Sequence, residues 1–117
     1  MIHVLAMITT KPGQRETVLA AVRATRPAVH AEKGCIDYAP AVDTPDFGKI
    51  QTTLGPDTFV VIEKWATAED LKAHSAAPHM AAYGAKVKTT SSTASFTSCR
   101  RPEGGYSDAG PHVSVYA

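Results

Sequence analysis

The stretch Phe59 to Tyr83, FVVIEKWATAEDLKAHSAAPHMAAY, decides the fold predicted for this chain. Residues 58–66 predict a strand whose side chains alternate between two faces. One face of this strand carries Phe59, Val61, Glu63 and Trp65. Thr67 is then suited to cap a short helix, with Asp70 at the matching position of a capping box. Pro78 fits the first turn of a further helix.

The residues before this stretch predict a strand, a helix and a second strand. Residues 2–10, IHVLAMITT, are apolar and partly β-branched, as in a buried strand. Apolar residues recur at helical spacing over residues 14–34, and Pro27 is expected to kink or restart this helix because it lacks an amide N–H. Residues 35–43 predict a strand at a sheet edge, since Pro40 is poorly suited to a central strand.

The other segments predict connections and two further strands. Residues 44–57 contain two prolines and two glycines and predict a long connection, in which residues 50–54 could extend a flanking strand. Residues 93–99 predict a fourth strand. Residues 102–111 predict a loop, and residues 112–116 predict a terminal strand.

The order strand–helix–strand, repeated once, predicts the overall fold. It indicates an α+β, ferredoxin-like, four-stranded antiparallel sheet with helices on one face. Right-handed crossovers place the fourth strand beside the first, followed by the third and the second. The length of 117 residues suits one domain. We expect it to span residues 1–117, with a core over residues 2–99 and a C-terminal tail over residues 100–117.

The charge balance and the apolar runs exclude several classes of protein. Lys and Arg number 12 against 11 for Asp and Glu, and no basic stripe exists to meet nucleic acid. The longest apolar run, about eight residues, is too short to span a bilayer, and no signal peptide is expected. Cys35 and Cys99 are predicted at opposite sheet edges, so no disulfide or metal site is expected. We predict a cytoplasmic protein without nucleic-acid or membrane partners.

The first and third strands are apolar on both faces. Leu5 and Met7 lie on the second face of the first strand, and Val60 and Ile62 lie on that of the third. Because the helices cover one face only, the second face needs another covering layer. In a chain this short, that layer is expected to be a second copy of the chain. We therefore predict a homodimer through the sheet face.

The chain resembles the antibiotic biosynthesis monooxygenase family in several segments over residues 2–99. These segments are Glu63-Lys64-Trp65, AEDLKAH at residues 68–74, Pro78-His79-Met80, Lys11-Pro12-Gly13 and EKGCIDY at residues 32–38. The resemblance implies a dimeric α+β barrel. It also implies a monooxygenase, without cofactor or metal, that acts on a small aromatic quinol or polyketide-like substrate in a pocket between sheet and helices. Such a substrate, once deprotonated, passes an electron to oxygen itself, so the protein supplies a base, an apolar pocket and exclusion of water.

His74, His79 and Tyr83 are the candidate catalytic residues. An imidazole can accept a phenolic proton near neutral pH. Tyr83 lies one helical turn after His79 and could present its hydroxyl to the same cavity. Each residue has a structural alternative: the histidines can serve helix ends, and the tyrosine can pack with its hydroxyl in solvent.

Five residues are candidates for substrate binding: Trp65, Glu63, Met7, Phe59 and Tyr38. Trp65 suits the core and can also form a pocket wall. The inward carboxylate of Glu63 needs a partner, which we expect across the dimer. Met7 and Phe59 fit either the pocket or the core.

Two other functions are compatible with parts of this pattern. Haem-degrading oxygenases of the same fold family use an asparagine on the first strand, where this chain has Ala6, Met7 and Thr9, so haem breakdown is not expected. The second alternative is a small-ligand binding or isomerising protein, or a dimeric module without chemistry. A cavity beside His74 or His79 would favour an enzyme or a binding protein over a module.

Overall fold

The computed structural model describes residues 1–102. The elements are β1 (Ile2–Thr10), α1 (Arg15–His30), β2 (Cys35–Ala41), β3 (Thr58–Trp65), α2 (Ala68–Ser75), α3 (Pro78–Val87) and β4 (Ser91–Cys99). This order confirms the predicted α+β, ferredoxin-like fold, including the two successive helices after β3. The predicted strand over residues 112–116 lies outside the described residues.

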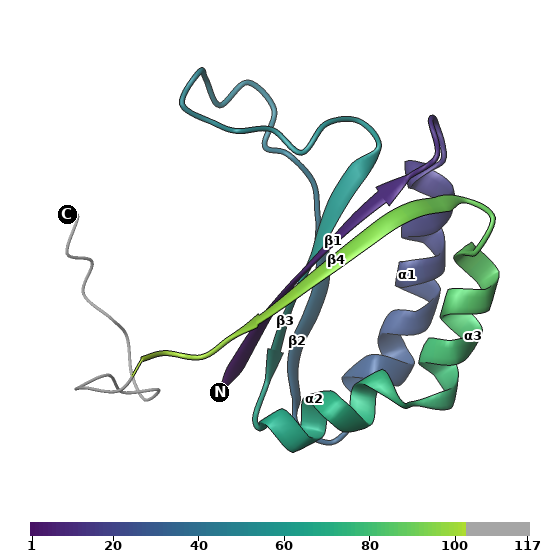
Figure 1. The fold of residues 1–117 in the computed structure, drawn as a ribbon, viewed down its shortest axis with the longest axis vertical. Coiled ribbons are helices and arrows are strands. Elements are labelled where there is room, and N and C mark those ends of the chain that lie inside the picture. Colours follow the sequence, from purple (N-terminus) through teal and green to yellow (C-terminus); the bar gives the residue numbers. More distant parts are fainter. Residues whose placement is uncertain (103–117) are drawn as a thin grey trace.

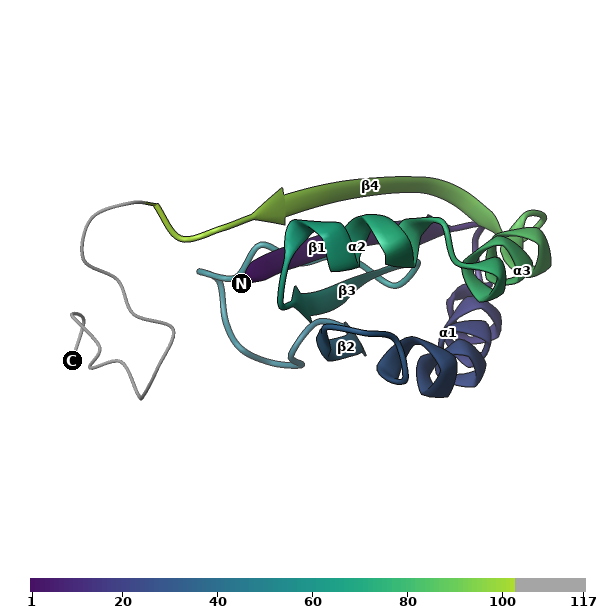
Figure 2. The ribbon, with the colours of Figure 1, turned by 90° about the horizontal axis from the view of Figure 1, so that it is seen from below.

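The four strands form one antiparallel sheet in the predicted order, β2-β3-β1-β4. Figure 2 shows the strands spread out in this order, with β4 and β2 at the two edges. Ala6 in the central strand β1 is paired with Val61 of β3 and with Phe96 of β4. Paired residues project from the same face of a sheet, so these three side chains form one row.

The helices lie on one side of the sheet (Figure 1), and the core fills the space between them and the sheet. Val18, Val22 and Val29 of α1 belong to the same buried cluster as Phe59 and Trp65 of β3. The inward face predicted for β3 is therefore confirmed. Within residues 1–102, no helix combines the length and the apolar character needed to cross a membrane.

Helix α1 differs from the prediction at its C-terminal end. It continues through Pro27 as one helix and ends at His30, whereas the sequence predicts a kink or restart and an end near Gly34. Proline removes the one hydrogen bond that an N–H at position 27 would donate to the Arg23 carbonyl, and the helix continues for only three residues beyond it. The chain then turns at Gly34, whose φ of 79° places it in the left-handed region.

The segment between β2 and β3 also differs from the prediction. Residues 50–54 form no strand. Instead, the carboxylate of Asp43 accepts hydrogen bonds from the backbone N–H groups of Leu54 and Gly55, at 2.7 and 2.9 Å. These backbone groups are thus paired within the loop. At the other end of the chain, β4 begins at Ser91, earlier than predicted, because Ser91 pairs with Thr10.

The sheet face opposite the helices carries exposed apolar side chains. Leu5 is 47% exposed and Ile62 is 38% exposed, and the two residues are direct neighbours across β1 and β3. Homodimer formation through this face stays a prediction.

A candidate active site between the sheet and helices α2 and α3

A pocket of about 370 Å³ opens between the sheet and the segment that joins α2 to α3. Its walls are largely apolar, with a few polar groups from β2, β3, α2 and α3. The lining residues are Ala6, Ile8, Tyr38, Val61, Glu63, His74, Ser75, Ala76, Ala77, Met80, Ala81, Tyr83 and Phe96. This volume lies within the range of small-molecule sites, and the mixture of walls and polar groups is typical of them.

His74 is one of the buried ionisable residues that line this pocket, and Glu63 is another. It lies in the last turn of α2, a helix whose N-terminus is capped by the Thr67 hydroxyl, which accepts the N–H of Asp70 at 3.1 Å. The His74 ring contacts Trp65, with ring centres 4.7 Å apart. His74 Nδ1 lies 2.8 Å from Glu32 Oε2. Because a carboxylate only accepts hydrogen bonds, this contact places the proton on Nδ1 and leaves a lone pair on Nε2 of the neutral ring.

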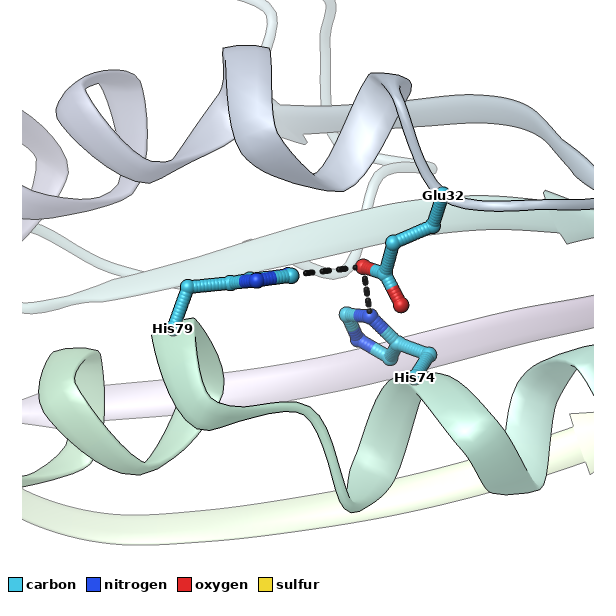
Figure 3. A group of neighbouring side chains, drawn as sticks. All are labelled: Glu32, His74 and His79. Carbon is cyan, nitrogen blue, oxygen red and sulfur yellow. Dashed lines mark hydrogen bonds and ion pairs between the residues drawn. The ribbon is translucent and has the colours of Figure 1, made fainter.

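His79 shares the acceptor of His74. It lies in the first turn of α3, and its Nε2 is 2.9 Å from the same Glu32 Oε2 (Figure 3). Its side chain is 30% exposed, and it is absent from the pocket lining. His79 and His74 are therefore linked by hydrogen bonds to the same oxygen of Glu32. Of the three predicted catalytic residues, His74 and Tyr83 line the pocket and His79 does not.

Glu63 has partners within its own chain, and the pairing across a dimer stays a prediction. The indole N–H of Trp65 donates to Glu63 Oε1 at 3.0 Å, and His74 Nε2 lies 3.8 Å from the same oxygen. Side-chain alternation on β3 explains the pairing, since Glu63 and Trp65 project from the same face. Burial raises the pKa of the Glu63 carboxyl, opposed by the Trp65 hydrogen bond and by His74.

Two tyrosines contribute hydroxyl groups to the pocket. Burial raises the pKa of Tyr38 well above its usual range, with a further contribution from Glu63. Burial likewise raises the pKa of Tyr83. Both phenols are therefore neutral near pH 7, and each can donate a hydrogen bond to a ligand oxygen.

Three of the predicted substrate-binding residues lie outside the pocket lining. Met7 pairs with Val60 and so projects from the sheet face opposite the helices; Ala6 and Ile8 line the pocket in its place. Phe59 and Trp65 are fully buried in the core. Trp65 still supports the pocket from behind, through its contacts with His74 and Glu63.

Glu32 is the site residue that sequence reasoning missed. It lies in the turn after α1, and the one available signal is its position at the start of the EKGCIDY segment. The neighbouring Gly34 allows this turn to pack closely against α2. Any residue with a Cβ atom at this position would overlap the Asp70 side chain. The Gly34 carbonyl also accepts the N–H of Ala66 at 2.8 Å. The Glu32 turn is thereby held beside the start of α2.

Glu32, His74 and His79 together have the donor atoms of a metal site. One ligand atom from each residue lies within 4.8 Å of the others. The prediction that no metal site exists rests on the two cysteines alone; Glu32 lies 42 and 47 positions before the two histidines.

Comparison with known proteins agrees with the predicted resemblance. Residues 1–86 match the antibiotic biosynthesis monooxygenase family. The chain is 42% identical over 90 residues to the probable quinol monooxygenase YgiN of Escherichia coli K12, an alignment that covers 75% of this chain and 86% of that protein.

Solved structures share the fold at lower sequence identity. A protein of Deinococcus radiodurans superimposes with a TM-score of 0.73 at 15% identity, covering 93% of this chain and 100% of that chain. A protein of Pseudomonas aeruginosa gives a TM-score of 0.70 at 22% identity, covering 87% and 94% of the two chains. These two likenesses establish the fold alone. The match over residues 1–86 and the 42% identity to YgiN show that the chain belongs to the antibiotic biosynthesis monooxygenase family.

Proposed function

We propose that the protein is a monooxygenase that acts on a small aromatic quinol or anthrone-like substrate in the pocket beside His74. The observation that carries the proposal is the buried His74 imidazole, which lines an apolar pocket and is oriented by Glu32. Membership of the family and the similarity to a probable quinol monooxygenase support oxygenation as the reaction. Following the family resemblance, the substrate itself supplies the electrons for oxygen.

The orientation of His74 suits it to act as a base. Glu32 holds the proton of the ring on Nδ1, so the Nε2 lone pair points away from Glu32. A substrate hydroxyl can donate its proton to Nε2. The imidazolium that forms lies between Glu32 and Glu63, and a negative charge on either carboxylate stabilises it. This arrangement, in which a carboxylate orients a histidine base, is used by many hydrolytic enzymes.

The chemical balance needs only the substrate and oxygen. For an anthrone-like substrate, proton transfer to His74 gives an electron-rich anion, which transfers one electron to O₂. The resulting radical pair joins through a new carbon–oxygen bond. Cleavage of the peroxide O–O bond then releases water, so that the CH₂ carbon becomes a carbonyl and the second oxygen atom leaves with both hydrogens. The apolar walls protect the anion from bulk water.

The tyrosines and the apolar walls position the substrate. The neutral hydroxyls of Tyr38 and Tyr83 can donate hydrogen bonds to a substrate oxygen. Ile8, Met80 and Phe96 supply apolar surface for an aromatic ring. A homodimer formed through the apolar sheet face remains part of this proposal.

The test is oxygen consumption with a panel of hydroquinones and anthrones. His74→Ala should lower the rate about 10²- to 10⁴-fold, the range usual for loss of a general base. His3→Ala is the control. His3 lies on β1 between Lys64 of β3 and Cys99 of β4, and it is absent from the pocket lining. Equal rates for wild type and His74→Ala would exclude His74 as the base.

A binding or isomerising protein is the second candidate function. The pocket volume of about 370 Å³ favours a binding protein over a module without chemistry, because a cavity of this size can hold a ligand whether or not oxygen reacts. Binding of panel compounds without oxygen uptake would support this candidate over the oxygenase.

A further inference from the structure

We propose that Glu32, His74 and His79 form a binding site for a divalent transition-metal ion of the Zn²⁺ or Fe²⁺ class. The ligand atoms are Glu32 Oε2, His74 Nδ1 and His79 Nε2, which converge from three elements (Figure 3). Two imidazoles and one carboxylate are a donor set that binds Zn²⁺ in hydrolases and Fe²⁺ in non-haem oxygenases. Ion binding is a separate property from the proposed oxygenation and can be measured without it, although both involve His74.

The spacing of the three atoms is close to that of ligands on one ion. Two ligand atoms that bind an ion at about 2.0–2.1 Å and at a right angle lie about 2.9 Å apart. The observed distances from Glu32 Oε2 are 2.8 Å to His74 Nδ1 and 2.9 Å to His79 Nε2. The two nitrogens, which lie within 4.8 Å of each other, need to approach to about 3–4 Å. His79 can make this movement, because its side chain is partly exposed.

The charges around the cluster favour a cation. Glu32 and Glu63 are both largely buried, with side chains 14% and 5% exposed. Among residues 1–102, their ion pairs are with His74 and His79, and no lysine or arginine pairs with either. A buried carboxylate is stabilised by a positive charge beside it. A divalent ion between Glu32 and the two imidazoles supplies this charge.

The backbone orders the turns that carry two of the three ligands, Glu32 and His74, before an ion binds. Cys35 N–H donates to the Glu32 carbonyl at 3.2 Å, and Ala77 N–H donates to the His74 carbonyl at 3.1 Å. Both contacts lie in the turns that carry the ligands, so little ordering is required on binding. The partly exposed His79 gives an ion a path from solvent.

The donor set also predicts which ions bind. Mg²⁺ and Ca²⁺ prefer oxygen ligands, whereas imidazole suits Zn²⁺, Co²⁺ and Fe²⁺. If the proposed function holds, a bound ion has a further effect, because coordination through Nδ1 leaves the His74 proton on Nε2. His74 can then no longer accept a proton from the substrate, so Zn²⁺ inhibits oxygenation.

The test is calorimetric titration of the full-length, chelator-treated protein with Zn²⁺. We expect a site that takes one ion per chain, and a titration with Mg²⁺ should produce no binding heat. His79→Ala and Glu32→Gln should each weaken this Zn²⁺ site at least about 100-fold, because even loss of a residue that supports a ligand costs about 10- to 100-fold. His3→Ala is the matched control and should retain the site.

Cobalt provides a second, spectroscopic readout. Co²⁺ bound by the cluster should give visible absorption bands in the wild type that are lost in His79→Ala. Because His79 is partly exposed, this variant should remain folded, which circular dichroism checks. The proposal is overturned if wild type and His79→Ala bind Zn²⁺ equally, or if the wild type binds none. These outcomes leave the oxygenase test unaffected, since binding is measured without substrate.

Discussion

One carboxylate oxygen of Glu32 organises the residues of the candidate site. Oε2 accepts hydrogen bonds from both His74 and His79, so the two imidazole orientations depend on a single atom. Hydrogen bonds to a charged acceptor are about twice as strong as neutral ones. A change at Glu32 therefore acts on α2 and α3 together.

Removal of the negative charge on Glu32 should destabilise the protein. Glu32→Gln keeps an oxygen acceptor but weakens both imidazole contacts, and we expect a loss of about 1–3 kcal/mol in the free energy of unfolding. Glu16→Gln is the matched control, because the Glu16–Arg23 pair is 3.9 Å long and well exposed, and its loss should cost less than about 0.5 kcal/mol. Urea denaturation measures both values. Equal losses would mean that the shared oxygen contributes little.

The sequence predicts some of these site residues and misses others for a physical reason. His74, Tyr83 and Tyr38 are visible as reactive groups on recognisable elements, and all of them line the pocket. Glu32 is missed because its hydrogen-bond partners lie 42 and 47 positions further along the chain. Met7 is also a pocket candidate, but it lies on the sheet face opposite the helices, where the alternation along β1 places it, and it is absent from the pocket lining.

At the scale of elements, the turn between α1 and β2 is packed against the start of α2. Gly34 has a φ of 79° and leaves no room for a Cβ atom beside Asp70. The same glycine accepts the N–H of Ala66, which follows β3. The turn after α1 and the stretch that joins β3 to α2, which are distant in sequence, thus meet at one glycine.

Gly34→Ala should destabilise the protein more than a glycine substitution with the same backbone conformation elsewhere. Gly13 provides the comparison, since its φ is 77° and its Cβ atom would meet nothing within 4 Å. Gly13→Ala should cost about 1–2 kcal/mol from the left-handed conformation, and Gly34→Ala should cost more because of the overlap. Thermal unfolding ranks the two variants.

A double variant separates the two causes. Asp70→Ala in the Gly34→Ala background removes the overlapping carboxylate and should recover part of the lost stability. If the two glycine variants unfold alike, packing against Asp70 is not the reason for the glycine.

The loop between β2 and β3 should lose order as pH falls. The backbone N–H groups of Leu54 and Gly55 hold the pKa of Asp43 below its usual range, with a smaller contribution from Arg15. A carboxyl with a lowered pKa in the folded state stabilises that state at pH values above its ordinary pKa. This contribution is lost as pH falls through the lowered pKa.

Amide chemical shifts of Leu54 and Gly55 measure this transition. They should titrate together with a midpoint below the ordinary Asp pKa of about 3.9. Asp43→Asn is the control and should abolish the step. A midpoint at or above the ordinary value would contradict the assigned hydrogen bonds.

The sequence predicts the elements better than their ends. Strand alternation, the Thr67 cap and Pro78 identify β3, α2 and α3. Residues 50–54, which could have extended a flanking strand, form none, and the Asp43 carboxylate accepts the N–H groups of Leu54 and Gly55 across the loop. Local patterns do not contain such contacts.

At the scale of the whole molecule, the sheet is covered on one face by helices and carries an apolar patch on the other. Leu5 and Ile62 lie side by side in this patch. Exposed neighbouring apolar residues on a small protein indicate a surface that associates. The proposed homodimer buries this patch.

A charge in the patch should separate the two copies. We expect Leu5→Glu to convert a dimer to a monomer, because a carboxylate would be buried without a partner. Lys86→Glu, on the exposed side of α3, is the control and should leave the mass unchanged. Analytical ultracentrifugation measures the mass of each variant. A monomeric wild type would refute the dimer.

The contacts at Gly34 have a consequence for how the protein can acquire new specificities. Gly34, Ala66 and Asp70 anchor the Glu32 turn, and none of them lines the pocket. Wall positions such as Ala81 and Phe96 can therefore be exchanged, and the cavity reshaped, while the reactive imidazole keeps its place. Divergence toward larger or smaller substrates, natural or by directed evolution, should begin at these walls.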